Sequence, residues 1–551
     1  MKDMSLWTEG DWIGAAGAVF LFAVLAVGGI IAARKSDEFA GHPRGLFVLF
    51  YAEMWERFSY YGMRALLILY LVKFWLFSDG QSNLIYGAYT SLVYITPVLG
   101  GYIADRWLGQ RKAVLFGGIV LAVGHLFMAY EGLQGVTDPA TKQADPAINV
   151  FWLALALIIV GSGFLKANIS VIVGQLYKMT DTRRDAAYTV FYMGVNTGAT
   201  LGTILVGYLG ETIGWSWGFG LAGIGMVLGL IIFVVGRPAL QGRGEPPRPL
   251  ARNREFLLYG VAVASVAVIW FLIQYVDVIQ SLLVVSGIAM LLYTLYEAFK
   301  LPKDARERIF AILFLIALNP LFWGLFEQAG GSLSLYTDKF VDRGGVPTSL
   351  FQSINPIYIV LFGPIFAGLW AWLGKKGLEP SAPAKFALAL AQVGLGFLVF
   401  VWGAGTGDPA VMTSVVFVFL IYMLHTTGEL CLSPVGLSAM TRLAPLHLGS
   451  FIMGAWFYMT AVGNFVAGKI GEATGGESGT MDKALTLAIY TKIGWITLGV
   501  AVVVLALSPI VKRWMHLDTL GDRAMDADLA GKPEFGLEAQ EAGFHPAMKQ
   551  D

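Results

Sequence analysis

Residues 53–64 read Glu-Met-Trp-Glu-Arg-Phe-Ser-Tyr-Tyr-Gly-Met-Arg, and they lie within the stretch 46–77, which is otherwise apolar enough to cross a bilayer. In a helix, offsets of three, four and seven residues return to one face, so the polar side chains of this segment share a stripe. A charge at the bilayer centre costs about 3 kcal/mol even on the most lenient insertion scale. The stripe is therefore expected to face a polar cavity or other charges, which indicates a transport pathway. Its members are Glu53, Glu56, Arg57, Tyr60, Tyr61 and Arg64.

The composition indicates a helical membrane protein. Of the 551 residues 56% are hydrophobic and only 14% are charged, which excludes a soluble globular class. The many glycines and aromatic residues suit closely packed membrane helices with aromatic belts at the interfaces. The formal net charge is zero, and Cys431 is the single cysteine, so nothing indicates nucleic-acid binding, disulfides or a cysteine-ligated metal.

Hydropathy predicts fifteen spans and hence an all-α polytopic fold. Lysine and arginine gather in alternate loops, such as the loop that holds Arg106, Arg111 and Lys112. Because such loops stay in the cytoplasm, the N-terminus is expected outside the cell and the C-terminus inside. The predicted spans are 12–33, 46–77, 84–105, 112–131, 148–175, 186–209, 214–236, 253–275, 278–299, 308–336, 352–374, 384–404, 410–437, 445–470 and 484–511.

Polar linkers divide the predicted spans into segments. The first span follows an acidic start and precedes basic residues, so a retained helix is expected rather than a signal peptide. The acidic C-terminal tail has two alternatives, a disordered extension or a lid over the basic cytoplasmic face. The segments are an extra N-terminal transmembrane helix with its connector (1–45), a six-helix bundle (46–236), a linker with two inserted helices (237–307), a second six-helix bundle (308–512) and a polar cytoplasmic tail (513–551).

An internal repeat appears at an offset of roughly 265 residues. Its matches predict that six-span halves were duplicated in parallel, which is the major facilitator arrangement with a site at the midplane. In that arrangement Lys166 and Glu429 occupy equivalent helices and face each other. The matching groups are Phe191-Tyr192-Met193 with Phe457-Tyr458-Met459, Pro97 and Gly101 with Pro364 and Gly368, and Lys166 and Ser170 with Glu429 and Ser433.

Polar motifs follow one another along the spans in a defined order. They are Glu53-x-x-Glu56-Arg57 with Tyr61 and Arg64, Tyr94-Ile-Thr-Pro97, Gly101-Tyr-Ile-Ala-Asp105-Arg106, Phe164-Leu-Lys166-Ala-Asn168-Ile-Ser170, Phe191-Tyr192-Met-Gly-Val-Asn196-Thr-Gly198, Trp323-Gly-Leu-Phe-Glu327-Gln328, Ser353-Ile-Asn355-Pro356 and Gly428-Glu429-Leu-Cys-Leu-Ser433-Pro434. With this set the chain resembles the proton-dependent oligopeptide transporters, also called the peptide transporter family, over residues 46–512. The inserted helix pair resembles that of bacterial members.

The chain departs from the family pattern in two places. Ala167 replaces the proline that usually follows the lysine, and the extra first span lies outside the family core. Gly87 stands where animal members of the family have a histidine, so carboxylates are expected to carry proton coupling.

The resemblance implies proton-coupled symport of di- and tripeptides into the cell by alternating access, in a bacterial inner membrane. The protein is then not an enzyme, needs no cofactor or metal besides the proton gradient, is surrounded by membrane lipid, and is expected to be monomeric. A peptide is a zwitterion, so Arg57 and Lys166 are expected to bind its carboxylate and Glu429 its ammonium group. The implied substrate-binding residues are Arg57, Tyr61, Tyr94, Lys166, Asn196, Trp323, Asn355, Glu429, Ser433 and Trp456.

Coupling and gating residues are implied as well. Glu53 and Glu56, together with Arg57, are expected to couple protons to transport. Arg64 and Glu327 are expected to form an outer gate, and Lys166 and Glu429 a second gate nearer the cytoplasmic side.

Structural alternatives accompany each role. The charges at 53–57 could hold helices together, and Lys166 with Glu429 could form a permanent packing salt bridge. Asn196 and Asn355 could join helices as buried amides do, and the aromatic residues could serve core packing. His125 and His425 have no partners readable from the sequence and are expected to serve ordinary packing or helix–helix hydrogen bonding.

Other function classes are less well supported. The chain has no His-Glu-x-x-His or Gly-x-Ser-x-Gly motif, which argues against a membrane enzyme. The duplicated halves and opposed charges favour a carrier over a channel or a peptide receptor. A family member that carries another small anion or metabolite, such as nitrate, is the main alternative.

Overall fold

The computed structural model describes residues 38–517 except 179, 180, 182 and 249, and also positions 10, 14, 17, 20, 24, 27 and 28. Most of the predicted first span, and the tail from residue 518 onward, lie outside these described residues. The remainder is dominated by long helices, so the all-α fold is confirmed.

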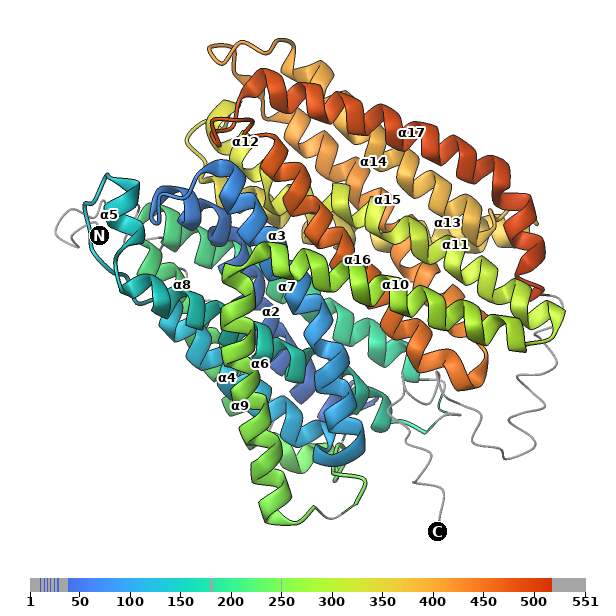
Figure 1. Ribbon diagram of the computed structural model, residues 1–551. Coiled ribbons are helices and arrows are strands. Elements are labelled where there is room, and N and C mark those ends of the chain that lie inside the picture. The colour runs from blue at the N-terminus through green and yellow to red at the C-terminus, as the bar shows by residue number, and fades with distance from the viewer. Residues whose placement is uncertain are drawn as a thin grey trace.

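Two groups of long helices are joined by a helical pair (Figure 1). The first bundle contains α2 (Arg44–Lys73), α3 (Asp79–Ile103), α4 (Gln110–Met128), α6 (Ala147–Gln175), α7 (Arg184–Thr212) and α8 (Trp215–Val235). The inserted pair consists of α9 (Arg252–Gln274) and α10 (Val276–Lys300). The second bundle contains α11 (Lys303–Phe326), α13 (Ile354–Lys375), α14 (Ala382–Ala404), α15 (Val416–Leu443), α16 (Gly449–Ala473) and α17 (Lys483–Trp514).

Short elements lie between the long helices. They include two pairs of very short strands, of which β1 and β2 are antiparallel and β3 and β4 are parallel. The elements are β1 (Glu38–Phe39), β2 (His42–Pro43), the π-helical turn η2 (Ala104–Leu108), α5 (Pro139–Gln143), the 3-10 turns η3 (Arg237–Leu240), η4 (Glu327–Gly330), η5 (Thr348–Ser353) and η6 (Leu446–Leu448), α12 (Ser332–Phe340), β3 (Val341–Asp342) and β4 (Thr413–Ser414).

The long helices match the predicted spans from 46–77 onward. Thirteen helical segments of the described chain are long and apolar enough to cross a membrane. Helix α2 is also long enough, but four charged side chains in its middle reduce its hydropathy. The protein is therefore an integral membrane protein with one charged helix among apolar ones.

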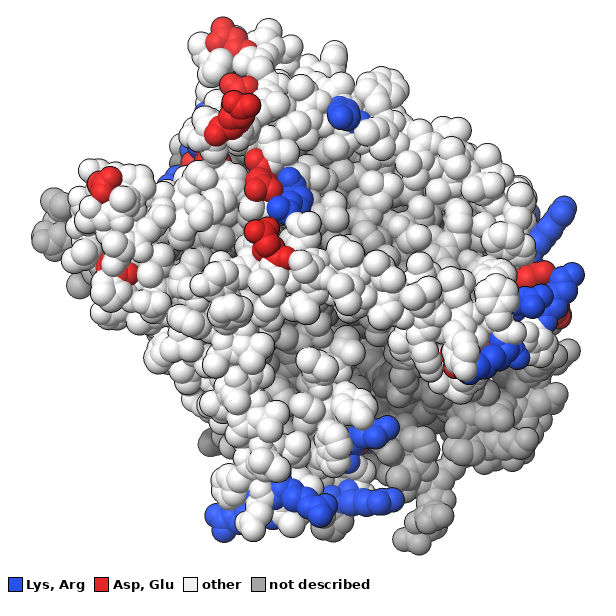
Figure 2. All heavy atoms as spheres, in the orientation of Figure 1, with Lys and Arg blue, Asp and Glu red and all other residues white. Residues whose placement is uncertain are grey.

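Charged residues lie at two opposite ends of the molecule. Figure 2 shows lysine and arginine along the lower and right edges of the visible face, most acidic residues toward the upper left, and a broad uncharged belt between them. We call the end with the α3–α4, α6–α7 and α8–α9 loops the basic end, and the end with the α2–α3, α4–α6 and α16–α17 loops the acidic end. An uncharged belt of this kind suits the hydrocarbon layer of a bilayer.

The predicted span 308–336 is interrupted, which corrects the continuous helix expected there. Helix α11 ends at Phe326, η4 follows, and α12 starts at Ser332 in a new direction. A Cβ atom at Gly330 would overlap the hydroxyl of Tyr86, so α3 approaches the chain too closely for a side chain. The break places Glu327 at a helix end that faces the first bundle.

The predicted span 410–437 is shifted, because α15 runs from Val416 to Leu443. Residues before it form a turn and the strand β4, in which the hydroxyl of Thr413 lies 2.9 Å from that of Tyr336. This hydrogen bond holds the start of the segment outside the helix. The apolar character of the sequence alone could not predict this hydrogen bond.

The inserted pair contacts both bundles. Helix α9 packs on the first bundle, where Trp270 Nε1 donates to the carbonyl of Asn149 at 3.4 Å and Lys112 pairs with Glu255 at 2.7 Å. Helix α10 contacts α11 and α16 of the second bundle and also α3 of the first. The residue Tyr275 alone separates α9 from α10.

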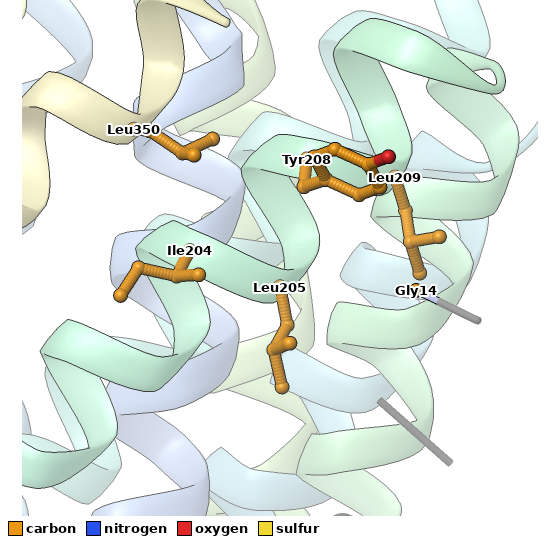
Figure 3. Close-up of a pocket in the computed structure, with 6 residues that line it drawn as sticks. All are labelled: Gly14, Ile204, Leu205, Tyr208, Leu209 and Leu350. Atoms are coloured by element: carbon orange, nitrogen blue, oxygen red, sulfur yellow. The ribbon is translucent and has the colours of Figure 1, made fainter. Parts of the chain in front are cut away.

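Described positions of the first predicted span are helical and lie against the first bundle. A Cβ atom at Gly14 would be 3.4 Å from the ring of Tyr208, and one at Gly28 would be 3.1 Å from the hydroxyl of Tyr51. Figure 3 shows a small cavity of about 220 Å³ between Gly14 and α7, with Leu350 on its other side. These contacts agree with an extra helix on the outside of the bundle.

Candidate functional site

The charged cluster of α2 is enclosed by the first bundle. Glu53, Glu56 and Arg57 are 2%, 1% and 4% exposed, so none of them faces lipid. Helices α2 and α7 approach closely because Gly198 and Gly202 have no side chains; a Cβ atom at either would overlap a carbonyl oxygen of α2. This backbone contact covers the charged residues with protein.

One guanidinium serves two carboxylates in this cluster. Arg57 Nε donates to Glu53 Oε1 at 2.7 Å and lies 3.0 Å from Glu56 Oε2. Neither oxygen of Glu56 has a hydrogen-bond partner among the described residues, and neither has Glu53 Oε2. Two buried carboxylates thus share one close cation, which leaves an excess negative charge when both are ionised.

Lys166 of α6 lies beside this cluster and faces aromatic rings. Its ammonium nitrogen is 4.1 Å from the ring centre of Tyr94 and 5.8 Å from that of Tyr60. Such cation–π contacts partly replace hydration. Within the part of the chain that the structure describes, Lys166 has electrostatic contact with Glu56 but forms no ion pair. The half-buried ammonium group is therefore available to an added anion.

Glu429 of α15 lies in the opposite bundle. Its Oε2 accepts a hydrogen bond from Asn355 Nδ2 at 3.0 Å, and the same amide nitrogen lies 3.0 Å from Thr426 Oγ1. The side chain of Glu429 is half-buried, and its electrostatic neighbours are Glu327 and Arg64. Lys166 and Glu429 do not pair in this conformation, because each is held by contacts within its own half.

Arg64 and Glu327 form an ion pair that joins the two bundles. Arg64 Nε also donates to the hydroxyl of Tyr86 at 2.6 Å, and its guanidinium lies 5.8 Å from the ring centre of Tyr61. Both charged side chains are buried. The ion pair predicted from the family resemblance is present, while its action as a gate stays a prediction.

The remaining predicted site residues occupy different surroundings. Tyr61, Tyr94, Trp323 and Ser433 are half-buried, as expected for groups near a cavity. Asn196 donates to the carbonyl of Tyr192, one turn earlier in its own helix, at 3.0 Å. Its amide nitrogen is thereby engaged locally, and its contact with substrate stays a prediction.

Trp456 is packed against other residues of the second bundle. It is 3% exposed and packs inside the second bundle, where a Cβ atom at Gly436 would overlap its ring. The backbone carbonyl of Trp456 accepts from Asn319 Nδ2 at 3.0 Å. The structure shows the packing contact, and the pocket-lining role stays a prediction.

His125 and His425 lie inside the helix groups. His125 is fully buried and neither ring nitrogen has a hydrogen-bond partner in the described chain. His425 packs between the rings of Phe326 and Phe397. Their packing fits the ordinary core role expected for them.

The sequence analysis did not predict a set of ion pairs and hydrogen bonds at the acidic end. Lys339 pairs with Asp79, and Lys73 pairs with Asp338 at 2.7 Å. Glu211 accepts from the backbone nitrogens of residues 348 and 349 at 3.0 and 2.9 Å. Each contact joins the first bundle to the second. Charged residues are common at the ends of all membrane helices, so no sequence signal separated these from ordinary interfacial ones.

Access to the site comes from the basic end. The interbundle contacts named above lie toward the acidic end, and Figure 1 shows the helix groups diverging toward the other end. Tyr192 is 51% exposed although its hydroxyl group is an electrostatic neighbour of Glu429 in the other bundle. Solvent therefore reaches Tyr192, on the side of the first bundle that faces Glu429.

The described part of the site contains no metal-binding group. Among the residues that the structure describes, no cluster of His, Cys, Asp and Glu could hold a metal ion. The arrangement instead offers the ammonium group of Lys166, the carboxylate of Glu429 and several phenols across a water-accessible space. Those groups suit a small molecule with both charges.

Comparison with known proteins gives a consistent result. The model of the POT family matches residues 111–483. The uncharacterized transporter YclF of Bacillus subtilis is 37% identical over 504 residues, which cover 88% of this chain and 98% of that protein. The peptide transporter YePEPT of Yersinia enterocolitica is 36% identical over 510 residues, which cover 87% of this chain and 96% of that protein. A crystal structure of a mutant form of the peptide transporter POT in complex with sulfate aligns with a TM-score of 0.76 at 34% identity and covers 88% of this chain and 98% of that one.

Proposed function

The chain belongs to the POT family of transporters, and from this membership we propose that it carries di- and tripeptides into the cell together with protons. Two of the proteins it resembles are themselves named peptide transporters. The membrane is a bacterial inner membrane, and the basic end faces the cytoplasm, since positively charged loops are retained there. The conformation described above is then open to the inside and closed to the outside.

One observation supports the choice of a short peptide as the substrate. Lys166 presents an ammonium group from the first bundle, and Glu429 presents a carboxylate from the second. A short peptide has a carboxylate at one end and an ammonium group at the other. Binding across the space would satisfy both protein charges at once and leave the peptide side chains to the surrounding aromatic residues.

Arg57 can strengthen the anionic end of this site. Its Nε donates to Glu53, and the two terminal nitrogens of a guanidinium carry four further N–H donors. A guanidinium can hold a carboxylate through two parallel hydrogen bonds. Arg57 and Lys166 would therefore bind the peptide carboxylate together.

The guanidinium of Arg57, which Glu53 and Glu56 share, suggests how proton movement is coupled to peptide transport. When a peptide carboxylate reaches Arg57 and Lys166, it adds negative charge beside Glu53 and Glu56. Like charges at close range favour the protonated form of one carboxyl group. Peptide binding and proton uptake at Glu53 or Glu56 would then support each other, which is the requirement for symport.

Alternating access follows from the two sets of interbundle contacts. Opening to the outside requires the Arg64–Glu327 pair to separate along with the outer contacts of Asp79 and Glu211. Closure at the basic end would bring α6 and α15 together, and with them Lys166 and Glu429. A substrate that occupies both charges competes with their pairing.

The alternative cargo, a small anion such as nitrate, fits the site less well. Nitrate could use Lys166 and Arg57, but it has no positive group to pair with the carboxylate of Glu429. The retained carboxylate argues for a substrate that carries a positive group.

Uptake into liposomes tests this proposal. Purified protein is placed in sealed vesicles, an inward proton gradient is imposed, and entry of radiolabelled dialanine is followed with and without a protonophore. We expect accumulation of chemically intact dipeptide that the protonophore abolishes, with competition by di- and tripeptides and none by nitrate. Gradient-independent flux would indicate a channel, and nitrate accumulation would indicate the alternative carrier.

A further inference from the structure

An apolar groove runs along the membrane face of the second bundle. It lies between α10 on one side and α11 and α16 on the other, and Figure 1 shows α10 alongside these two helices. Its volume is about 780 Å³. This space is remote from the charged site between the bundles, so peptide binding does not account for it.

The groove follows one face of each bordering helix. On α16 its lining recurs every three or four residues from Ile452 to Lys469, and on α10 from Gln280 to Thr294. At 1.5 Å per residue, the α16 face is about 25 Å long. One leaflet of the hydrocarbon layer is about 15 Å thick. The groove is therefore long enough to hold a whole acyl chain parallel to the helices.

A single tyrosine keeps the groove open. The hydroxyl of Tyr458 on α16 donates to the backbone carbonyl of Leu283 on α10 and lies 2.8 Å from Ser286 Oγ. Gly287 makes room for the ring, since a Cβ atom there would be 3.3 Å from that hydroxyl. Tyr458 thus bridges α16 to α10 across the groove, and space remains on either side of its ring.

The groove has a charged end. Lys469 lies about one turn before the end of α16 at the acidic end of the molecule, where the interface of the membrane is expected. Its side chain is 36% exposed and pairs with Glu472 at 3.2 Å. Gln280 lies near the matching end of α10. A lysine at the interface attracts lipid phosphate groups, and its exposed pairing partner suits the amine of a zwitterionic headgroup.

We propose that this groove binds one phospholipid of the leaflet at the acidic end, with an acyl chain between α10 and α16 and the phosphate at Lys469. The apolar lining matches the chain, and the Lys469–Glu472 pair matches the headgroup. The opposite face of α10 is exposed, with Val285 67% accessible, so the helix is solvated by lipid on both sides. The bound lipid completes the packing of α10 on the second bundle.

Native mass spectrometry of the full chain in detergent tests the site, with phosphatidylethanolamine as the titrant. Ala317→Trp fills the groove from α11, where this residue is exposed to it. Lys469→Gln removes the headgroup charge. The matched controls are Val285→Trp on the outer face of α10 and Lys300→Gln, whose lysine forms a similar pair with Glu297 at the other end of α10.

The proposal predicts a distinct pattern. The wild type and both controls should bind the first phosphatidylethanolamine with the same affinity, while Lys469→Gln weakens it about fivefold. Ala317→Trp should abolish this first binding step while keeping the elution volume and melting temperature of the wild type. Diacylglycerol, which has no phosphate, should bind the wild type and Lys469→Gln equally and more weakly than the phospholipid.

Three results would overturn the proposal. One is unchanged phospholipid binding in Ala317→Trp, and another is equal affinity of the wild type for diacylglycerol and phospholipid. The third is a dimer that dissociates in Ala317→Trp, which would assign the groove to a second copy of the chain.

Discussion

Arg64 of α2 and Glu327 of η4 form a buried ion pair that connects the first bundle to the second at a point where α11 breaks. Close to this break Gly330 leaves room for the hydroxyl of Tyr86, and Tyr86 also accepts a hydrogen bond from Arg64. The end of α11, the carboxylate of Glu327 and its partner in the other bundle thus lie together in one local arrangement.

Replacing Glu327 with glutamine should open the acidic end. Loss of one partner of a buried pair costs about 3 kcal/mol, so the closed state should lose its advantage over an outward-open state. Spin labels at positions 141 and 346, with Cys431 replaced by serine, would report the separation of the bundles by pulsed electron resonance. We expect a longer distance in the Glu327→Gln variant. An unchanged distance distribution would show that Arg64 and Glu327 do not hold this end shut.

Neutralising the carboxylates beside Arg57 should uncouple transport. We expect Glu53→Gln or Glu56→Gln to abolish proton-driven uptake but to leave some exchange of peptide across the membrane without a gradient. The reason is that the proton loses its acceptor while Lys166 and Glu429 remain. Uptake and counterflow are measured in the same vesicles, with Glu307→Gln as a peripheral control. Full gradient-driven accumulation in both variants would contradict the role in coupling.

Lys166 and the peptide carboxylate should behave as one interaction. Lys166→Ala and amidation of the peptide should each cost several kcal/mol of binding, about 3 kcal/mol for a buried partner left unpaired. Applied together, the two changes should cost little more than one. The measurement is a double-mutant cycle. The dissociation constants of free and amidated dialanine are each measured with the wild type and with Lys166→Ala. Fully additive losses would show that Lys166 reads another part of the peptide.

The contact between α3 and α16 should be sensitive to added volume at Gly87. A Cβ atom there would lie 2.6 Å from Cα of Gly468, so Gly87→Ala should lower stability by about 1–3 kcal/mol. Gly363→Ala in α13 is the matched control, since nothing lies within 4 Å of a Cβ atom added at that position. Thermal unfolding in detergent compares the two. Equal melting temperatures would mean that α16 can move aside at no cost.

The same contact leaves no room for a larger side chain at position 87. No histidine could fit between α3 and α16 as they are packed here, because even a methyl group meets backbone atoms. The sequence predicted that carboxylates take over proton coupling, and the structure adds the steric reason why position 87 is closed to a larger side chain.

Hydropathy predicted most of the helices because each must be long and apolar to cross a bilayer. It could not place the break after Phe326, because the residues on both sides of that break are apolar enough to continue one span. The charges of α2 were predicted to be enclosed, since lipid excludes them, and burial of Glu53 and Glu56 confirms this.

The absence of a Lys166–Glu429 pair in this conformation was beyond sequence analysis for a different reason. Whether two opposed charges meet depends on the state of the transporter, and one sequence serves all states. The groove beside α10 was hidden as well. In a membrane, apolar residues face both lipid and protein, so periodicity does not separate the two faces as it does in water.

The inserted pair has a consequence for how far the bundles can rotate. Helix α9 is fastened to the first bundle through Trp270 and Glu255, α10 is fastened to the second through Tyr458, and Tyr275 alone joins them. The two helices thus link the first bundle to the second through side-chain contacts at both ends. A rotation that moves Asn149 away from Leu283 would therefore pull on the contacts of both helices, so this lipid-facing pair would resist the separation of the two bundles along its own length.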